Sequence, residues 1–200
     1  ELSALRKGYV TFGSLTRLAR LNDPLLRAWK EILEHVPDSR LRLDQKPFAV
    51  ETEREFFLHR LEQLGIPRER VELTYSTPHW TAYHDIDITL DCWPHNAGTT
   101  TIESLWMGVP VLSKMDRPSV GCFGAAILKP LGLEDWVVAD ETTYIEKAVV
   151  YAQDLDTLAL LRASLRQRVE TSQLLNAQAM TLNLEDAYRE MLEEIEASSL

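Results

Sequence analysis

Residues 87–112 contain the pattern that most restricts the fold: a short apolar run, a polar turn, a helix and a second apolar run. Ile88 and Leu90 alternate with polar residues in the first run, and residues 109–112 form the second. The turn at 96–98 contains a glycine, which permits unusual backbone dihedrals, and three threonines then begin the helix. A strand–helix–strand unit of this kind predicts two parallel strands in one sheet.

Short apolar runs and amphipathic helices alternate from residue 9 to residue 138. The other strands are expected at 9–12, 41–43, 71–75 and 136–138, and the other helices at 22–36, 50–64, 79–83 and 124–131. Parallel strands need crossover connections, which return over the faces of the sheet. This order therefore predicts an α/β fold, a Rossmann-like parallel sheet with helices on both faces.

The chain is expected to form one domain, residues 1–200, because no internal repeat or low-complexity linker divides it. From about residue 142 onward it is expected to be helical, with a break near 172–176. The last helices are acidic and amphipathic. We expect them to pack along the sheet or against a partner domain rather than to carry chemistry.

Composition argues against several classes of function. The chain is 45% hydrophobic and 26% charged, which is typical of a globular protein with a substantial core. A net charge of −10 argues against non-specific binding to nucleic acid or to an anionic membrane. The sequence shows no apolar run long enough to span a membrane and no signal segment. Its two cysteines lack metal-binding spacing, so a cytoplasmic location is expected.

The threonines Thr99, Thr100 and Thr101 suggest an anion site. A helix start carries free N–H groups and a partial positive charge, so hydroxyls gathered there suit a phosphate. In a simpler interpretation Thr100 caps the helix and Glu103 completes a capping box. Capping alone would not explain three threonines after Asn-Ala-Gly. Ligands of parallel sheets bind beyond the carboxyl ends of the strands, which is where this turn lies.

Four segments carry a family resemblance: 9–20, 84–91, 96–110 and 131–136 closely resemble bacterial members of the O-GlcNAc transferase and SPINDLY family. The similarity covers nearly the whole chain, in order and with family-like spacing. It implies the C-terminal half of a two-domain GT-B catalytic region, the half that binds the uridine diphosphate part of the sugar donor. The family usually also has an N-terminal catalytic lobe and upstream TPR helices. Neither occurs in this sequence, so they are expected as missing partners.

The resemblance implies individual roles in the donor site. Thr99 and Thr100 match threonines that bind the diphosphate, and Glu103, one helical turn beyond Thr99, matches an acidic residue that contacts the ribose. His79 matches a histidine that flanks the nucleotide. The full set expected to bind the UDP-sugar is Arg17, His79, Asn96, Gly98, Thr99, Thr100, Thr101 and Glu103.

Arg20 is the expected catalytic residue, because it falls where the family carries a lysine that neutralises the leaving diphosphate. A guanidinium keeps its charge and can hold phosphate through two N–H groups, but it is not equivalent to an ammonium. Arg17 replaces an amide, Gly98 replaces a histidine of some members, and Cys122 replaces an arginine. Two cations at 17 and 20 would either strengthen diphosphate binding or indicate an altered donor.

The leading hypothesis is an inverting, metal-independent transferase that moves N-acetylglucosamine from UDP-GlcNAc to Ser or Thr hydroxyls of an acceptor protein. Two alternatives remain: a non-catalytic nucleotide-sugar-binding module, and a related asparagine glucosyltransferase that uses UDP-glucose. An unrelated Rossmann-like protein is disfavoured because no GxGxxG follows a predicted strand.

Asp85 and Asp87 spell the DxD motif with which glycosyltransferases of another fold hold a divalent metal. Here both acids precede a strand instead of following one, so they are expected at the wrong edge of the sheet. No metal and no other cofactor is therefore expected.

Overall fold

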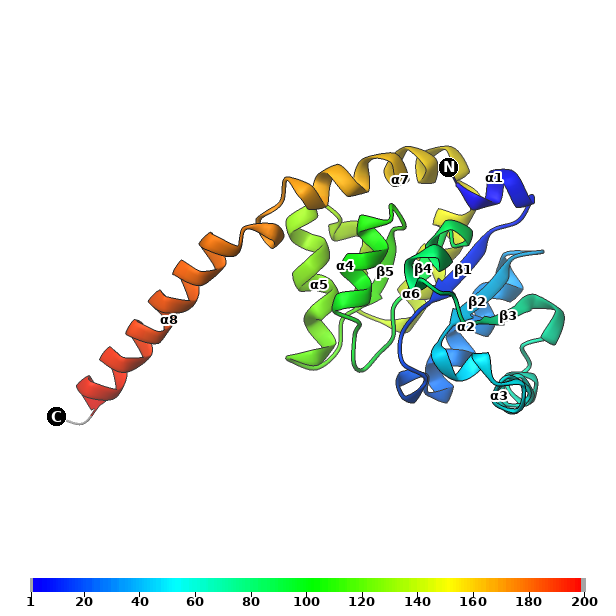
Figure 1. Ribbon diagram of the computed structural model, residues 1–200, viewed down its shortest axis with the longest axis horizontal. Coiled ribbons are helices and arrows are strands. Elements are labelled where there is room, and N and C mark those ends of the chain that lie inside the picture. Colours follow the sequence, from blue (N-terminus) through cyan, green and yellow to red (C-terminus); the bar gives the residue numbers. More distant parts are fainter. Residues whose placement is uncertain (1, 199–200) are drawn as a thin grey trace.

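Six parallel strands form one sheet in the order β3-β2-β1-β4-β5-β6 (Figure 1). The computed structural model describes residues 2–198. The strands are β1 (Thr11–Ser14), β2 (Arg40–Asp44), β3 (Val71–Thr74), β4 (Ile88–Leu90), β5 (Val111–Lys114) and β6 (Val137–Val138). β1 pairs with both β2 and β4, so the strand order reverses between β1 and β4. The loops that follow these two strands therefore flank the switch point, where such sheets bind ligands.

The helices are α1 (Ser3–Lys7), α2 (Asp23–His35), α3 (Glu51–Gln63), α4 (Thr99–Trp106), α5 (Phe123–Leu128), α6 (Glu141–Gln153), α7 (Leu155–Glu170) and α8 (Ala177–Ser198). Side chains alternate across a strand, so β4 shows which face each layer covers. The Thr89 hydroxyl lies 2.7 Å from that of Ser104, which places α4 on one face. Ile88 and Leu90 point to the other face, where α2 and α6 pack together. The predicted α/β sheet with helices on both faces is confirmed.

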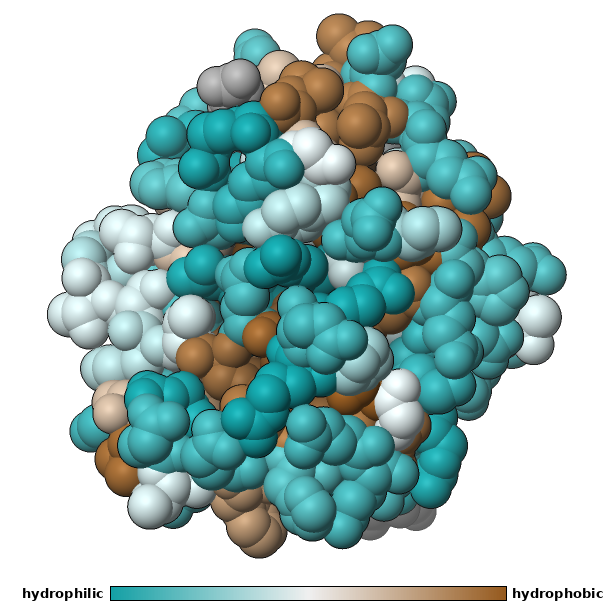
Figure 2. Space-filling view, turned by 90° about the vertical axis from the view of Figure 1, so that its right-hand side faces the viewer, coloured by the Kyte–Doolittle hydropathy of each residue, from teal (hydrophilic) through white to brown (hydrophobic). Residues whose placement is uncertain are grey.

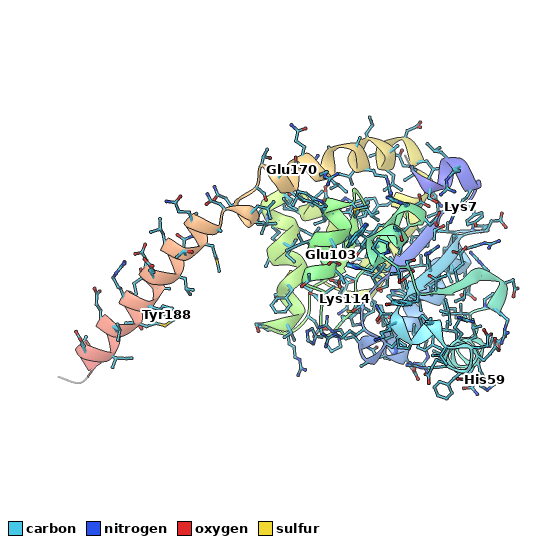
Figure 3. The ribbon with its side chains drawn as sticks, in the orientation of Figure 1. Lys7, His59, Glu103, Lys114, Glu170 and Tyr188 are labelled. Carbon is cyan, nitrogen blue, oxygen red and sulfur yellow. The ribbon has the colours of Figure 1, made fainter. Side chains whose placement is uncertain are left out.

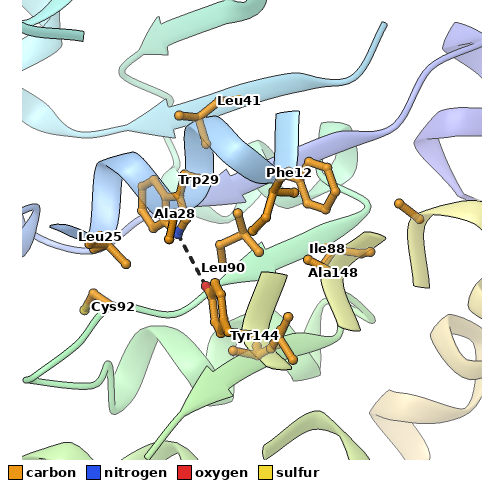
Figure 4. Packing of buried hydrophobic residues seen from close by; sticks show 14 of the residues in the cluster. Phe12, Leu25, Ala28, Trp29, Leu41, Ile88, Leu90, Cys92, Tyr144 and Ala148 are labelled. Carbon is orange, nitrogen blue, oxygen red and sulfur yellow. Dashed lines mark hydrogen bonds between the residues drawn. The ribbon is translucent and has the colours of Figure 1, made fainter. Parts of the chain in front are cut away.

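The core under α2 and α6 is tied to the carboxyl end of β4 (Figure 4). Trp29 of α2 donates its indole N–H to the Tyr144 hydroxyl of α6 at 3.4 Å, and both rings are fully buried. Tyr144 in turn donates its hydroxyl to the backbone carbonyl of Asp91 at 3.0 Å. The Tyr144 ring also meets the Trp93 ring edge-on at 4.7 Å. Packing on this face thus holds the turn that follows β4.

The start of α2 follows the pattern read from the sequence. The Asn22 side chain accepts the Leu25 N–H at 3.0 Å, and Pro24 occupies the first turn. Asn22 also donates its amide to the Trp93 carbonyl at 2.6 Å. The cap therefore joins the loop after β1 to the turn after β4.

Two local features differ from the expectation. The sequence predicts the first strand at 9–12, ending before Gly13, but β1 runs from Thr11 to Ser14. Gly13 belongs to the strand because it pairs with Arg42 of β2 and with Thr89 of β4. A Cβ there would lie only 2.4 Å from the Ile86 side chain, so glycine suits this close approach. The short helix α1 was not anticipated. It ends at Gly8, whose φ of 79° is in the left-handed region.

The C-terminal helices behave differently from one another. α6 packs on α2, and α7 packs on α4, as expected of helices that cover a sheet. α8 extends away from the other elements (Figure 1), and side chains such as Tyr188 project from it (Figure 3). Its large apolar residues are mostly exposed: Met180, Leu182, Leu184, Tyr188, Met191, Leu192 and Ile195. It does not pack along the sheet.

The surface opposite α8 is mostly hydrophilic, with apolar residues in small groups (Figure 2). Within residues 2–198, no helix has the length and apolar character needed to cross a membrane.

Candidate functional site

The start of α4 forms a cradle at the switch point of the sheet. β4 ends at Leu90, a turn follows, and Gly98 occupies the N-cap position without a side-chain hydrogen bond. The next two residues, Thr99 and Thr100, are exposed and half-buried respectively. The backbone N–H groups of this first turn carry the positive end of the helix dipole. With the two hydroxyls they make a site suited to a phosphate.

Two arginines from the loop after β1 face the cradle. Arg17 is exposed and Arg20 is half-buried. Arg20 donates an Nη1 hydrogen to the Asn96 backbone carbonyl at 3.1 Å, so its guanidinium is held over the turn that precedes α4. A cavity of about 330 Å³ lies between these elements, lined by Leu15, Thr16, Arg17, Arg20, Asn96, Gly98, Thr99, Thr100 and Phe123. We refer to it as the polar cavity.

His79 and Glu103 contact each other on the other side of α4. His79 begins a 3-10 helix, His79–Asp85, and its Nε2 lies 3.2 Å from Glu103 Oε1. Glu103 therefore does not complete a capping box, and its side chain faces outward. A second cavity of about 810 Å³ is lined by His79, Trp80, Gly98, Thr99, Ile102, Glu103, Trp106, Met107, Phe123, Ala126, Ile127 and Arg166. The two cavities share Gly98, Thr99 and Phe123, so the start of α4 separates them.

Two residues of the expected donor set have side chains committed to the protein itself. Asn96 is fully buried, and its amide donates to the carbonyls of Cys92 at 2.8 Å and Lys114 at 3.1 Å. Thr101 is 1% exposed and donates its hydroxyl to the Ala97 carbonyl at 3.1 Å. Both side chains therefore hold the turn and the helix, and the expected role of these two residues in binding the UDP-sugar stays a prediction. Asn96 lines the polar cavity, and its backbone carbonyl accepts the hydrogen bond from Arg20.

The pair Asp85 and Asp87 lies at the amino end of β4, at the edge away from the cradle. Asp85 forms ion pairs with Arg6, Lys7 and Arg42. Asp87 is fully buried and accepts the backbone N–H groups of Ala4 and Thr11. Asp87 thus ties α1 to β1, and Asp85 ties α1 to Arg42 of β2.

Asp91 supports the cradle, although the sequence indicated it only as the end of a strand. It is 2% exposed, and its carboxylate accepts hydrogen bonds from Cys92, Ala97 and Ser113. Burial raises the pKa of Asp91 to about 6, although these hydrogen bonds and Arg20 lower it. The only indication of Asp91 in the sequence is its position, an acidic residue directly after an apolar strand. Its burial and its hydrogen bond to Ser113 depend on the fold and cannot be predicted from the sequence.

The fold and the cradle at its switch point define a Rossmann-like domain suited to binding a phosphorylated ligand. The chain belongs to glycosyltransferase family 41, whose model matches residues 3–184. It is 41% identical over 192 residues to a "Probable UDP-N-acetylglucosamine--peptide N-acetylglucosaminyltransferase SPINDLY" of Solanum lycopersicum, and 39% identical to the Arabidopsis thaliana protein of the same name. Both alignments cover 94% of this chain and 21% of the relative, so the chain spans about a fifth of these relatives.

Solved structures agree with this assignment. An O-GlcNAc transferase variant from Thermobaculum terrenum superposes with a TM-score of 0.83 and 34% identity, covering 92% of this chain and 36% of that one. The Anabaena protein HepE, solved with UDP and glucose, gives a TM-score of 0.62 at 14% identity, covering 92% of this chain and 52% of that one. The second likeness concerns the fold alone. The family model, the SPINDLY relatives and the Thermobaculum terrenum structure confirm the expected family and the GT-B type of Rossmann-like domain.

Proposed function

We propose that this chain binds the donor in an inverting, metal-independent transferase that moves N-acetylglucosamine from UDP-GlcNAc to Ser or Thr hydroxyls of an acceptor protein. One observation carries the proposal: Arg17, Arg20, Thr99 and Thr100 line the same cavity at the start of α4. Two permanent cations, two hydroxyls and a helix N-terminus are complementary to a diphosphate. The choice of N-acetylglucosamine as the sugar and of a peptide as the acceptor follows the names of the SPINDLY relatives.

The chemical demand on this site is the negative charge that grows on the departing UDP. The acceptor oxygen forms a bond to the anomeric carbon while the bond from that carbon to the phosphate oxygen breaks, so the electron pair leaves with UDP. The proton of the acceptor hydroxyl passes to a general base or to water. Arg20, oriented by the Asn96 carbonyl, would stabilise that charge together with the Thr99 and Thr100 hydroxyls. The arginines make a metal unnecessary for this role. The nucleoside would extend to His79 and Glu103, with the Glu103 carboxylate accepting a ribose hydroxyl.

A catalytic lobe would complete the active site, because a GT-B site lies between two domains, and TPR repeats would lie upstream of that lobe. We therefore expect residues 1–200 alone to bind UDP weakly and to transfer no sugar. Cys92 and Cys122 are both free thiols, which supports action in a reducing, cytoplasmic compartment.

Calorimetry on this chain with UDP, UDP-GlcNAc, UDP-glucose and GDP tests the donor. We expect the uridine nucleotides to bind, GDP to bind more weakly, and Thr100→Ala to lower the UDP affinity about tenfold. Thr142→Ala, an exposed threonine on α6, is the control and should leave the affinity unchanged. Absence of UDP binding by the unaltered chain would overturn the proposal, and a clear preference for UDP-glucose would favour the glucosyltransferase.

Arg20→Ala in the longer enzyme tests the catalytic role. Loss of one preorganised donor typically costs about 3 kcal/mol of barrier, so turnover should fall roughly a hundredfold while the folding stability changes little. Arg27→Ala, an exposed arginine on α2, is the matched control. Unchanged turnover in Arg20→Ala would count against this assignment.

A further inference from the structure

Asp91 is a buried carboxylate at the carboxyl end of β4, where the turn into α4 begins. Its Oδ1 accepts two backbone N–H groups, those of Cys92 and Ala97, each at 2.8 Å. A single oxygen atom therefore holds both ends of the turn that leads into the cradle. Because Ala97 immediately precedes the N-cap Gly98, the position of this oxygen decides where α4 starts.

The second oxygen of Asp91 ties this turn to neighbouring elements. Oδ2 accepts the hydroxyl of Ser113, on β5, at 2.6 Å. Gly124 of α5 packs against the same place: a Cβ there would lie 1.9 Å from Ser113 Oγ and 3.1 Å from Asp91 Oδ2. The carboxylate is thus enclosed by β4, β5 and α5 and has little freedom to move.

The same turn carries the group that orients Arg20. The Asn96 side chain fixes the turn by donating to the carbonyls of Cys92 and Lys114. The Asn96 backbone carbonyl then accepts from Arg20 at 3.1 Å. A continuous set of hydrogen bonds therefore links the Asp91 carboxylate to both walls of the polar cavity, the start of α4 and the Arg20 guanidinium.

We propose that Asp91 is a positioning residue of the donor site, which fixes the turn so that α4 and Arg20 face the diphosphate before it binds. The inference rests on the proposed function and deepens it. Asp87 provides a matched control at the opposite end of β4. It is also fully buried and also accepts two backbone N–H groups, from Ala4 at 2.9 Å and Thr11 at 2.8 Å, but it lies at the edge away from the cradle.

The test compares Asp91→Leu, Asp91→Asn and Asp87→Leu by calorimetry with UDP and UMP, at a temperature where urea unfolding shows each variant to be folded. Leucine keeps the shape and removes the acceptors, whereas asparagine keeps an oxygen for the two N–H groups. We expect Asp91→Leu to lower the UDP affinity about tenfold and the UMP affinity much less, because the cradle serves the diphosphate. Asp91→Asn should keep most of the UDP affinity of the unaltered chain. Asp87→Leu should lower the stability but leave the UDP affinity nearly unchanged.

Amide hydrogen exchange of the unaltered chain keeps the inference testable if Asp91→Leu does not fold. The Ala97 amide should be equally protected with and without UDP, because the turn is already fixed. An Ala97 amide that exchanges freely until UDP is added would overturn the inference. So would equal losses of UDP affinity in Asp91→Leu and Asp87→Leu, or undiminished UDP binding by Asp91→Leu. If the unaltered chain binds no UDP, the proposed function itself fails.

Discussion

Asp91 titrates unusually because it is buried at the end of β4. Burial raises its pKa from the ordinary value of 3.8 to about 6, against the opposing effects of Ser113, Ala97, Cys92 and Arg20. The folded chain therefore holds this proton more tightly than the unfolded chain. The stability that the folded chain gains by binding this proton is fully present below about pH 4 and is lost as the pH rises through about 6.

Asp91→Asn imitates the protonated side chain and cannot titrate. Its free energy of unfolding, relative to that of the unaltered chain, should rise by about 2 kcal/mol between pH 4 and pH 7. Urea unfolding at several pH values measures this difference. Asp140→Asn is the control with the opposite sign, because the hydrogen bond from the Thr143 N–H lowers the pKa of Asp140. A flat difference for Asp91→Asn would contradict the raised pKa.

Gly13 leaves no room for a side chain between β1 and Ile86. A Cβ at this position would lie 2.4 to 2.8 Å from three atoms of the Ile86 side chain, which is fully buried. Gly13→Ala should therefore destabilise the fold by about 1–3 kcal/mol, as overpacking usually does. Urea unfolding measures the loss, and Ile86→Val in the same chain should recover part of it. A Gly13→Ala variant as stable as the unaltered chain would show that Ile86 can move aside.

Sequence reasoning identified side chains by type, but it could not assign their partners. Thr99, Thr100 and Thr101 looked equivalent in the sequence. Helix periodicity turns the third one inward, where the Ala97 carbonyl accepts its hydroxyl. The Asn96 amide likewise has two partners within the protein, the carbonyls of Cys92 and Lys114, that the sequence does not indicate. Such assignments depend on contacts between residues far apart in the sequence.

The N-cap of α2 connects two elements rather than one. The Asn22 side chain caps α2 by accepting the Leu25 N–H, and it also donates its amide to the Trp93 carbonyl. Asn22→Ala should lower the free energy of unfolding by about 1–2 kcal/mol for the cap, with a further loss from the freed carbonyl. The N-cap Asp154 of α7, which accepts the Thr157 N–H, is the control for a cap alone. If Asp154→Ala costs as much as Asn22→Ala by urea unfolding, the bond to Trp93 contributes nothing.

Most strands and helices could be predicted because local patterns determine them. The strand at Ile88–Leu90 and the helix start after Asn22 coincide with the apolar runs and cap signals of the sequence. The expected bounds of β1 differ from the observed ones because glycine normally weakens a strand, whereas here Gly13 pairs with neighbours on both sides. α1 was missed because it is only five residues long.

The folded body should be largely independent of α8. Since nearly all α8 residues are exposed, deletion of residues 177–200 should shift the thermal unfolding midpoint by no more than about 2–4 °C, which corresponds to roughly 1 kcal/mol. The shortened chain should also associate less, because the exposed apolar residues of α8 are removed. Calorimetry and light scattering measure the two effects. A much lower midpoint would mean that α8 supports the body.

Because α8 extends away from the other elements, the net charge of the chain is not spread evenly around the polar cavity. α8 holds six acidic residues and one arginine, which is half of the net charge of −10. A helix of 22 residues is about 33 Å long, whereas charges are screened beyond about 8 Å at physiological salt. An approaching nucleotide anion would therefore experience mainly the field of Arg17, Arg20 and their neighbours. Overall charge is a poor guide to which ions this molecule attracts.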